Sequence, residues 1–251
     1  MERYQVILAY DGTQYLGYQR QENEANSGGY RTIQGVVEAA LRRIGWLGGA
    51  ILAAGRTDTG VHASGQVIAF DLEWKHTPDD LVAALNANLP IDVAAQSARL
   101  KKPDFHPRYD AIARRYCYRV FCQPVRNPMR ERYCWRVWPP VELDRLHSTA
   151  AKLVGTHDFV AFGKPPRPEG TTIRTVFQAG WRIDDEDFEF GIQADAFLYR
   201  MVRRLVYAQI LIGQNKWSPE LMFPRPENME RRLIQGLAPP QGLVLAEVTY
   251  E

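Results

Sequence analysis

The sequence has few cysteines and no long apolar run. Its three cysteines (Cys117, Cys122 and Cys134) are odd in number and form no CxxC pair, which excludes a disulfide framework. No apolar stretch approaches the length of a membrane-spanning helix, and the N-terminus lacks a signal-peptide pattern. We therefore expect a reduced cytoplasmic protein with no membrane partner.

Motifs for metals, nucleotide phosphates and activated serines are also absent. The five histidines show no HxxxH or HExxH spacing. Neither GxxxxGK[ST], nor GxGxxG, nor a GxSxG elbow occurs. We expect no metal site and no cofactor.

Lysine is scarce: six of the 31 basic residues are lysine and 25 are arginine. The net charge is only +2, but residues 99–136 hold eleven Lys or Arg against three acids, a local charge of +8. Such a run is typical of a solvated basic surface. The aromatic residues within it favour an RNA surface instead, because unstacked bases need aromatic faces as well as phosphate contacts.

Hydrophobic periodicity predicts strands and helices in alternation along the whole chain. We expect helices over residues 33–45 (with Thr32 as N-cap), 78–89, 143–154 and 197–212. We expect strands over residues 5–10, 50–54, 66–72, 93–100, 114–121, 133–138, 172–183, 188–195 and 243–249. This order predicts an α+β fold of two pseudo-duplicated β-α-β-β-α-β lobes with mainly antiparallel sheets, residues 1–105 and 106–251.

Two further segments are predicted to be loops. Residues 22–30, ENEANSGGY, are polar and contain glycine and serine. Residues 164–170, KPPRPEG, hold three prolines and form either a rigid spacer or a lip of a binding cleft.

The stretch AAGRTDTGVHASGQV, residues 53–67, presents one carboxylate in a loop between two predicted strands. Asp58 lies between Arg56 and His62, and Gly55 and Gly60 allow the backbone to turn or to approach a ligand closely. The tripeptide DTG also occurs in aspartic proteases, but these need two such aspartates that share a proton. Only one is present, and the nearby arginine favours a fully ionised carboxylate. On the tripeptide alone, Asp58 could also simply cap a turn.

The larger set of motifs is more specific. AGRTDTGVHA occurs in order with YDGTQYLGYQRQ, NANLP, DFHPRYDAIARRYCYRV, HDFVAF, TIRTV, DAFLYRMVRRLV and APPQGLVL. Together they resemble the bacterial tRNA pseudouridine synthase A family, which modifies positions 38, 39 and 40 of the anticodon stem-loop. The resemblance covers nearly the whole chain. It implies the pseudouridine synthase fold, with an active-site cleft between the lobes, and conversion of uridine to pseudouridine without cofactor or metal.

The resemblance also implies roles for single residues. Asp58 becomes the catalytic carboxylate, which attacks C1′, attacks the base or removes a ribose proton. Tyr116 becomes the active-site tyrosine, whereas the adjacent Tyr118 is better explained as core. Arg203 becomes the cation beside Asp58, although its neighbours Arg200 and Arg204 compete for that role on the residues alone.

Further residues are implied to contact tRNA. Arg56 matches an arginine that enters the RNA helix when the base is flipped out, with a simple phosphate contact as the alternative. His62 is expected to organise the loop. The remaining predicted RNA contacts are Phe105, His106, Arg108, Tyr109, Arg114, Arg115 and Arg167. The resemblance also implies a homodimer.

The match has departures, since Arg204 and Tyr207 replace the asparagine and glycine usual in the family, and residues 223–236 are atypical. The alternative function is a non-catalytic RNA-binding protein or chaperone on the same fold. The joint presence of Asp58, Tyr116 and Arg203 argues against that alternative.

Overall fold

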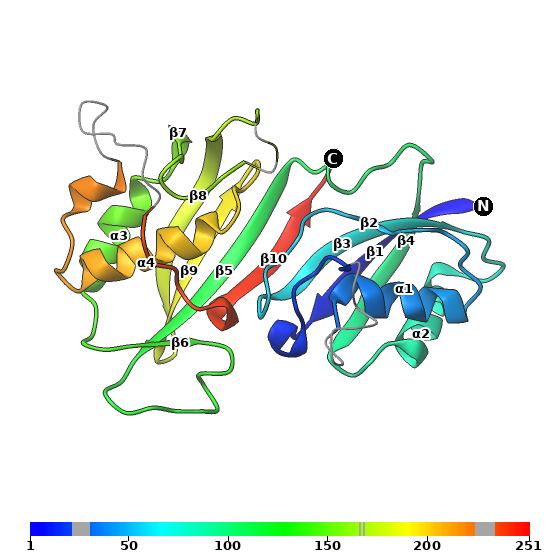
Figure 1. Cartoon of the computed structure of the whole chain (residues 1–251), viewed down its shortest axis with the longest axis horizontal. Helices are drawn as coiled ribbons and strands as arrows, with labels where there is room; N and C mark the ends of the chain where they lie inside the picture. Colours follow the sequence, from blue (N-terminus) through cyan, green and yellow to red (C-terminus); the bar gives the residue numbers. More distant parts are fainter. Residues whose placement is uncertain (22–30, 166, 168, 224–233) are drawn as a thin grey trace. The chain divides into compact units, whose positions relative to one another are not determined.

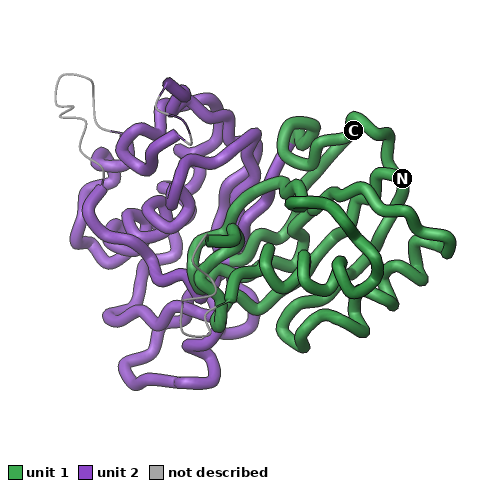
Figure 2. The backbone as a smooth tube through the Cα atoms, turned by 45° about the vertical axis from the view of Figure 1, so that its right-hand side comes forward, with its two compact units in different colours: residues 1–112, 244–251 green, residues 113–243 purple. Residues whose placement is uncertain are grey.

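The chain folds into two compact units in the computed structural model, which describes residues 1–21, 31–165, 167, 169–223 and 234–251. Unit 1 comprises residues 1–112 and 244–251, and unit 2 comprises residues 113–243 (Figure 2). The predicted loop 22–30 and most of segment 223–236 lie outside the described residues.

Unit 1 combines a mostly antiparallel sheet with two helices (Figure 1). Its elements are β1 (Glu2–Tyr10), the short 3-10 helix η1 (Gly12–Gln14), α1 (Ile33–Arg43), β2 (Leu52–Ala53), β3 (His62–Leu72), α2 (Pro78–Asn88), β4 (Val93–Lys101) and β10 (Leu243–Thr249). The strand order is β4-β1-β3-β10, with β2 paired to β3. All these pairs are antiparallel except β3 with β10.

Local sequence explains both helices of unit 1. Thr32 caps α1 by accepting a hydrogen bond from the Gly35 N–H, as predicted. Thr77 and Asp80 form a reciprocal capping box at the start of α2, which packs against β4.

Unit 2 also combines helices with an antiparallel sheet, in the order β5-β9-β8-β7. Its elements are β5 (Ala113–Cys122), β6 (Trp135–Val137), α3 (Leu143–Ala151), β7 (Gly155–Asp158), β8 (Ile173–Asp184), β9 (Asp187–Ala194), α4 (Met201–Gly213), and the 3-10 helices η3 (Pro219–Met222) and η5 (Pro240–Gly242). Strand β6 adds to β5 in parallel, and α3 packs on both α4 and β8. The α+β class and the mainly antiparallel sheets are confirmed.

The unit boundaries differ from the predicted lobes 1–105 and 106–251. Unit 1 extends to Ile112 and includes residues 244–251, which hold most of the chain's last strand, β10. The reason is pairing at long range: Val244 and Leu245 of β10 pair with His62 and Ala63 of β3. Element order alone does not reveal which sheet a terminal strand joins.

Three elements differ most from the periodicity prediction. Helix α4 begins at Met201 instead of Phe197, because Arg200 adopts a left-handed backbone with φ 62°. Strand β3 begins at His62, four residues earlier than expected, because this end pairs with β1 and β10. Strand β7 was not predicted.

Membrane insertion has no support in the helices of this fold. Across the described ranges, none of the helices is both long enough and apolar enough to span a bilayer.

Candidate active site

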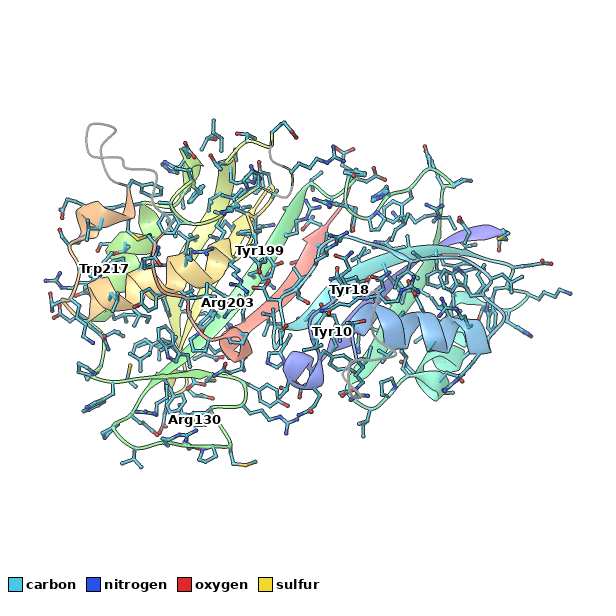
Figure 3. The ribbon with its side chains drawn as sticks, viewed as in Figure 1. Tyr10, Tyr18, Arg130, Tyr199, Arg203 and Trp217 are labelled. Atoms are coloured by element: carbon cyan, nitrogen blue, oxygen red, sulfur yellow. The ribbon has the colours of Figure 1, made fainter. Side chains whose placement is uncertain are left out.

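Residues 54–61 form the loop between β2 and β3, and Thr57 anchors this loop by hydrogen bonds to other parts of unit 1. Thr57 is buried, and its hydroxyl lies 2.9 Å from the Tyr10 hydroxyl. Its carbonyl accepts a hydrogen bond from the Tyr18 N–H at 3.0 Å. Tyr10 and Tyr18 belong to the motif YDGTQYLGYQRQ and lie close together in unit 1 (Figure 3). The neighbours of Thr57 face outward: Arg56 is exposed and Asp58 is half-buried.

The loop then turns tightly after Asp58. The Asp58 carbonyl accepts a hydrogen bond from the Val61 N–H at 3.1 Å, and Gly60 adopts φ 76°. A residue with a side chain rarely adopts this conformation, so the predicted turn role of Gly60 is confirmed. At Gly55 an added Cβ would meet nothing within 4 Å, so packing does not require a glycine there.

The segment that follows β1 contacts both the loop and the start of β3. Gly17 adopts φ 96°, and an added Cβ would lie 3.0 Å from the Thr57 carbonyl oxygen. The Gly12 N–H donates to Nδ1 of buried His62 at 3.0 Å, and the same nitrogen lies 3.1 Å from an Asp11 carboxylate oxygen. These contacts join His62, the first residue of β3, to the segment that follows β1, and its predicted role in organising the loop stays a prediction.

Gln66 is a supporting residue that sequence reasoning missed. It is fully buried on β3, and its Nε2 donates to the Gly55 carbonyl at 3.0 Å and to the Tyr10 hydroxyl at 3.5 Å. A glutamine among the apolar residues of a strand was the available signal, because a buried amide needs hydrogen-bond partners.

Tyr116 and Tyr118 lie two residues apart on β5 of unit 2. Tyr116 is half-buried, and its ring meets the edge of Phe197 at a centroid distance of 5.0 Å. Tyr118 is fully buried, and its hydroxyl donates to the Pro239 carbonyl at 2.7 Å. Burial raises the pKa of Tyr118 well above its usual value, and the charge of Arg203 opposes that shift. Tyr118 is therefore a core residue, and Phe197 is an aromatic partner of Tyr116 instead of a helix residue.

Arg203 is the buried member of the three competing arginines. It lies in the first turn of α4 (Figure 3), and its Nε–H donates to the Ala238 carbonyl at 2.7 Å. Arg200 is exposed and stacks on Tyr199, with 4.7 Å from guanidinium to ring centroid. Arg204 donates to the carbonyls of Phe162 and Tyr199, each at 3.2 Å. Burial distinguishes Arg203 from its two neighbours, and its role as the cation beside Asp58 stays a prediction.

Residues 105–109 divide into one anchor and an exposed group. Phe105 is buried and meets the ring of Tyr250 at 5.3 Å, so it anchors the segment and does not present its ring at the surface. The rings of His106 and Tyr109 lie 4.3 Å apart, and the Arg108 guanidinium lies 6.0 Å from the Tyr109 centroid. Tyr109 is largely exposed.

The other three predicted RNA contacts are not brought together. Arg114 is half-buried and donates to the Asp195 carbonyl at 2.8 Å. Arg115 is exposed, and strand alternation directs it to the face of β5 opposite Tyr116. Arg167 is exposed, in a loop whose residues 166 and 168 are outside the described part of the chain.

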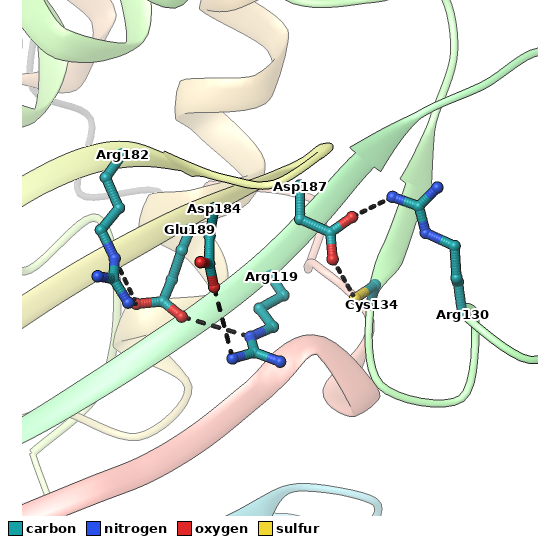
Figure 4. A network of polar contacts seen from close by, with 7 residues as sticks. All are labelled: Arg119, Arg130, Cys134, Arg182, Asp184, Asp187 and Glu189. Atoms are coloured by element: carbon teal, nitrogen blue, oxygen red, sulfur yellow. Dashed lines mark hydrogen bonds and ion pairs between the residues drawn. The ribbon is translucent and has the colours of Figure 1, made fainter.

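The basic stretch 99–136 is partly neutralised by acids from elsewhere in the sequence. Arg119 pairs with Glu189 and Asp184, and Arg130 pairs with Asp187 (Figure 4). These acids belong to the hairpin of β8 and β9, whose two-residue turn places them beside β5. The local charge of +8 therefore overstates the positive surface.

No metal site emerges from the described residues, in which no three His, Cys, Asp or Glu side chains gather to hold an ion. The three cysteines are free thiols.

Comparisons with known proteins identify the family. A family model described as tRNA pseudouridine synthase matches residues 6–110 and 149–251. The "tRNA pseudouridine synthase A" proteins of Thermotoga petrophila and Thermotoga maritima are each 37% identical, over the full length of this chain and of the relative. That of Limosilactobacillus fermentum is 36% identical over all of this chain and 97% of the relative. A solved Cbf5-Nop10-Gar1 complex matches 82% of this chain and 45% of the other, at 10% identity and a TM-score of 0.36.

The matches span both units. They include the loop of Asp58 and the helix of Arg203, while residues 111–148, with Tyr116, are matched by the full-length relatives alone. The chain belongs to the tRNA pseudouridine synthase family.

Proposed function

We propose that this chain converts uridine to pseudouridine at positions 38, 39 and 40 of the tRNA anticodon stem-loop, with Asp58 as its one catalytic carboxylate. The observation that carries the proposal is the loop of residues 54–61. In a chain of this family, this loop holds a single half-buried aspartate, Asp58, beside a tight turn. The residue before it, Thr57, is buried and hydrogen-bonded in the core.

The reaction needs little beyond a well-placed carboxylate. The N1–C1′ bond of uridine breaks, the base turns, and C5 bonds to C1′, while C5 loses its proton and N1 gains one. Nothing is oxidised or reduced, so no redox cofactor enters the balance. Asp58 acts by attack on C1′, by attack on the base or by removal of a ribose proton, and each route requires the ionised form.

Arg203 and Tyr116 are proposed to meet the same nucleotide. Arg203 would supply the cation beside the Asp58 carboxylate. The Tyr116 ring, supported by Phe197, would stack on uracil, and its hydroxyl would help to move the C5 proton. Arg56, exposed beside buried Thr57, would fill the gap that the flipped base leaves in the RNA helix.

Contacts to tRNA outside the reacting nucleotide are assigned to exposed residues. His106, Arg108 and Tyr109 form a compact group of two rings and a cation. Phe105 would hold this group in place from the core. Arg114, Arg115 and Arg167 would contact phosphates.

The cellular setting follows from the substrate. We place the protein in the cytoplasm, where tRNA is processed, and we propose that it acts as a homodimer. Full-length similarity to pseudouridine synthases argues against the aspartic protease that the DTG tripeptide alone would allow.

The test is release of tritium from tRNA labelled with [5-³H]uridine. We expect Asp58→Asn to lower the rate of release by at least about 10²-fold, the scale of a positioned acid–base group, while tRNA binding is retained. Equal release by wild type and Asp58→Asn would contradict the catalytic assignment. Binding without release by the wild type would support the non-catalytic alternative.

A further inference from the structure

A chain of buried polar groups lies directly behind the loop of Asp58. Gln66 Nε2 donates to the Gly55 carbonyl and to the Tyr10 hydroxyl, which lies 2.9 Å from the Thr57 hydroxyl. Tyr10, Thr57 and Gln66 are 4%, 8% and 0% exposed, so none of these side chains offers a surface to RNA. The chain joins β1, β3 and the loop through three side chains and the main-chain carbonyl of Gly55.

All three side chains are buried, so solvent water has little access to replace a hydrogen-bond partner that is lost. Burial raises the pKa of Tyr10 to about 12, so its phenol is protonated and keeps its donor at neutral pH. A buried polar group that loses its partner is strongly penalised, which ties Thr57 to this one position.

Thr57 stands between the two residues with proposed roles at the RNA. Its side chain points inward, whereas Arg56 on one side is exposed and Asp58 on the other is half-buried. The buried Thr57 side chain therefore fixes the backbone between these two residues. The Tyr18 N–H donates a second hydrogen bond at this residue, to the Thr57 carbonyl.

We propose that Tyr10, Thr57 and Gln66 are positioning residues, which hold the backbone of Asp58 in its reactive position without touching the substrate. This inference rests on the proposed catalytic role of Asp58. Reaction rates are sensitive to displacements of about 1 Å, which can cost on the order of 10²-fold. The loss should thus appear in the chemical step and not in tRNA affinity.

The experiment compares variants by single-turnover pseudouridine formation and by tRNA binding. Tyr10→Phe and Thr57→Val each delete one hydroxyl, and we expect a rate at least about 10-fold lower with a tRNA Kd within about twofold of wild type. Thr57→Ser keeps the hydroxyl and should restore most of the rate.

Tyr4→Phe is the matched control. Tyr4 lies on the same strand, is also buried, and its hydroxyl donates to Glu2 at 3.1 Å. It should keep the wild-type rate, although it too deletes a tyrosine hydroxyl. The double variant of Tyr10→Phe with Thr57→Val should be slowed by less than the product of the single effects, because both break one interaction.

Three outcomes would overturn the positioning role. They are wild-type rates in Tyr10→Phe and Thr57→Val, fully multiplicative losses in the double variant, or an equal loss in Tyr4→Phe. An active wild type with an inactive Asp58→Asn keeps the proposed function in each of these cases. A wild type that makes no pseudouridine would overturn the proposed function, and the positioning role with it.

Discussion

Arg203 and Ala238 hold each other by two hydrogen bonds. The Arg203 Nε–H donates to the Ala238 carbonyl at 2.7 Å, and the Ala238 N–H donates back to the Arg203 carbonyl at 3.2 Å. The two residues come from α4 and from the segment before η5, far apart in the sequence. The first bond orients the guanidinium through Nε, which a lysine at the same position would not reproduce, and the second bond joins the two main chains.

Arg203→Ala should therefore reduce turnover far more than tRNA affinity. We expect a loss of at least about 10²-fold in single-turnover rate, with a much smaller change in Kd, because the proposed partner of Arg203 is Asp58 and not a phosphate. Arg203→Lys should rescue little of the rate.

The control for this prediction is Arg200→Asn. It removes the same charge at an exposed position, and asparagine tolerates the left-handed backbone found there. It should leave the rate of the chemical step near that of wild type. Matched losses of rate and affinity in Arg203→Ala would mean that Arg203 is only a phosphate contact.

Tyr116→Phe should separate stacking from proton transfer. The phenyl ring keeps the edge-to-face contact with Phe197, so tRNA binding should be unchanged. Loss of the hydroxyl should slow removal of the C5 proton by about 10²-fold and increase the isotope effect on C5 deuteration, measured with deuterated tRNA. A wild-type rate and isotope effect in Tyr116→Phe would restrict Tyr116 to stacking.

Asp71 should contribute to the loss of stability in acid. Its carboxylate accepts two hydrogen bonds from Arg3, at 2.6 and 2.8 Å, which lower its pKa below the ordinary value of 3.8. A lowered folded pKa means that the stabilisation is complete above pH 3.8 and is lost as the pH falls through the folded value.

The measurement for Asp71 is urea unfolding at pH 7 and pH 3. Asp71→Asn should lower the free energy of unfolding at pH 7 by about 0.2–1 kcal/mol, the range for a partly exposed pair, and should show a smaller further loss at pH 3 than the wild type. Asp185→Asn, at an exposed turn position, should follow the wild-type profile. Identical profiles for all three proteins would contradict the prediction.

Cys134 should be the least reactive of the three thiols. It is buried, and burial together with Asp187 raises its pKa to about 12, so the nucleophilic thiolate is scarce at pH 8. We expect iodoacetamide to label half-buried Cys117 before Cys134, as followed by peptide mass spectrometry. In denaturant the two should react alike. Equal rates in the native protein would contradict this assignment.

Local patterns in the sequence were sufficient for most elements of the fold. Thr32 and the apolar period after it predicted α1, and alternation predicted β5. These signals work because capping and periodicity act over a few residues. They failed at Phe197, where the apolar spacing predicts the start of a helix. The left-handed backbone of Arg200 instead makes α4 begin at Met201, four residues later. The conformation at that residue is a local exception that periodicity does not register.

The candidate site was found from motifs, but its supports were not. Asp58, Arg56 and Gly60 stand in one short stretch, so the sequence displays them together. Gln66 acts through its side-chain amide and Ala238 through its main-chain carbonyl. Each group matters only because of the hydrogen-bond partner that the fold brings to it. Such partners become visible only when distant segments are brought into contact.

By itself, the sequence determined the α+β class, most of the helices and strands, the single aspartate in its loop and the family. Each of these follows from residue type and spacing along the chain. Only the tertiary structure decided that β10 joins unit 1, that Arg203 is the buried arginine of α4, and that Arg119 and Arg130 of the basic stretch 99–136 pair with acids of the β8–β9 hairpin. Strand pairing, burial and charge pairing are relations between segments remote in sequence, and a linear pattern carries no record of them.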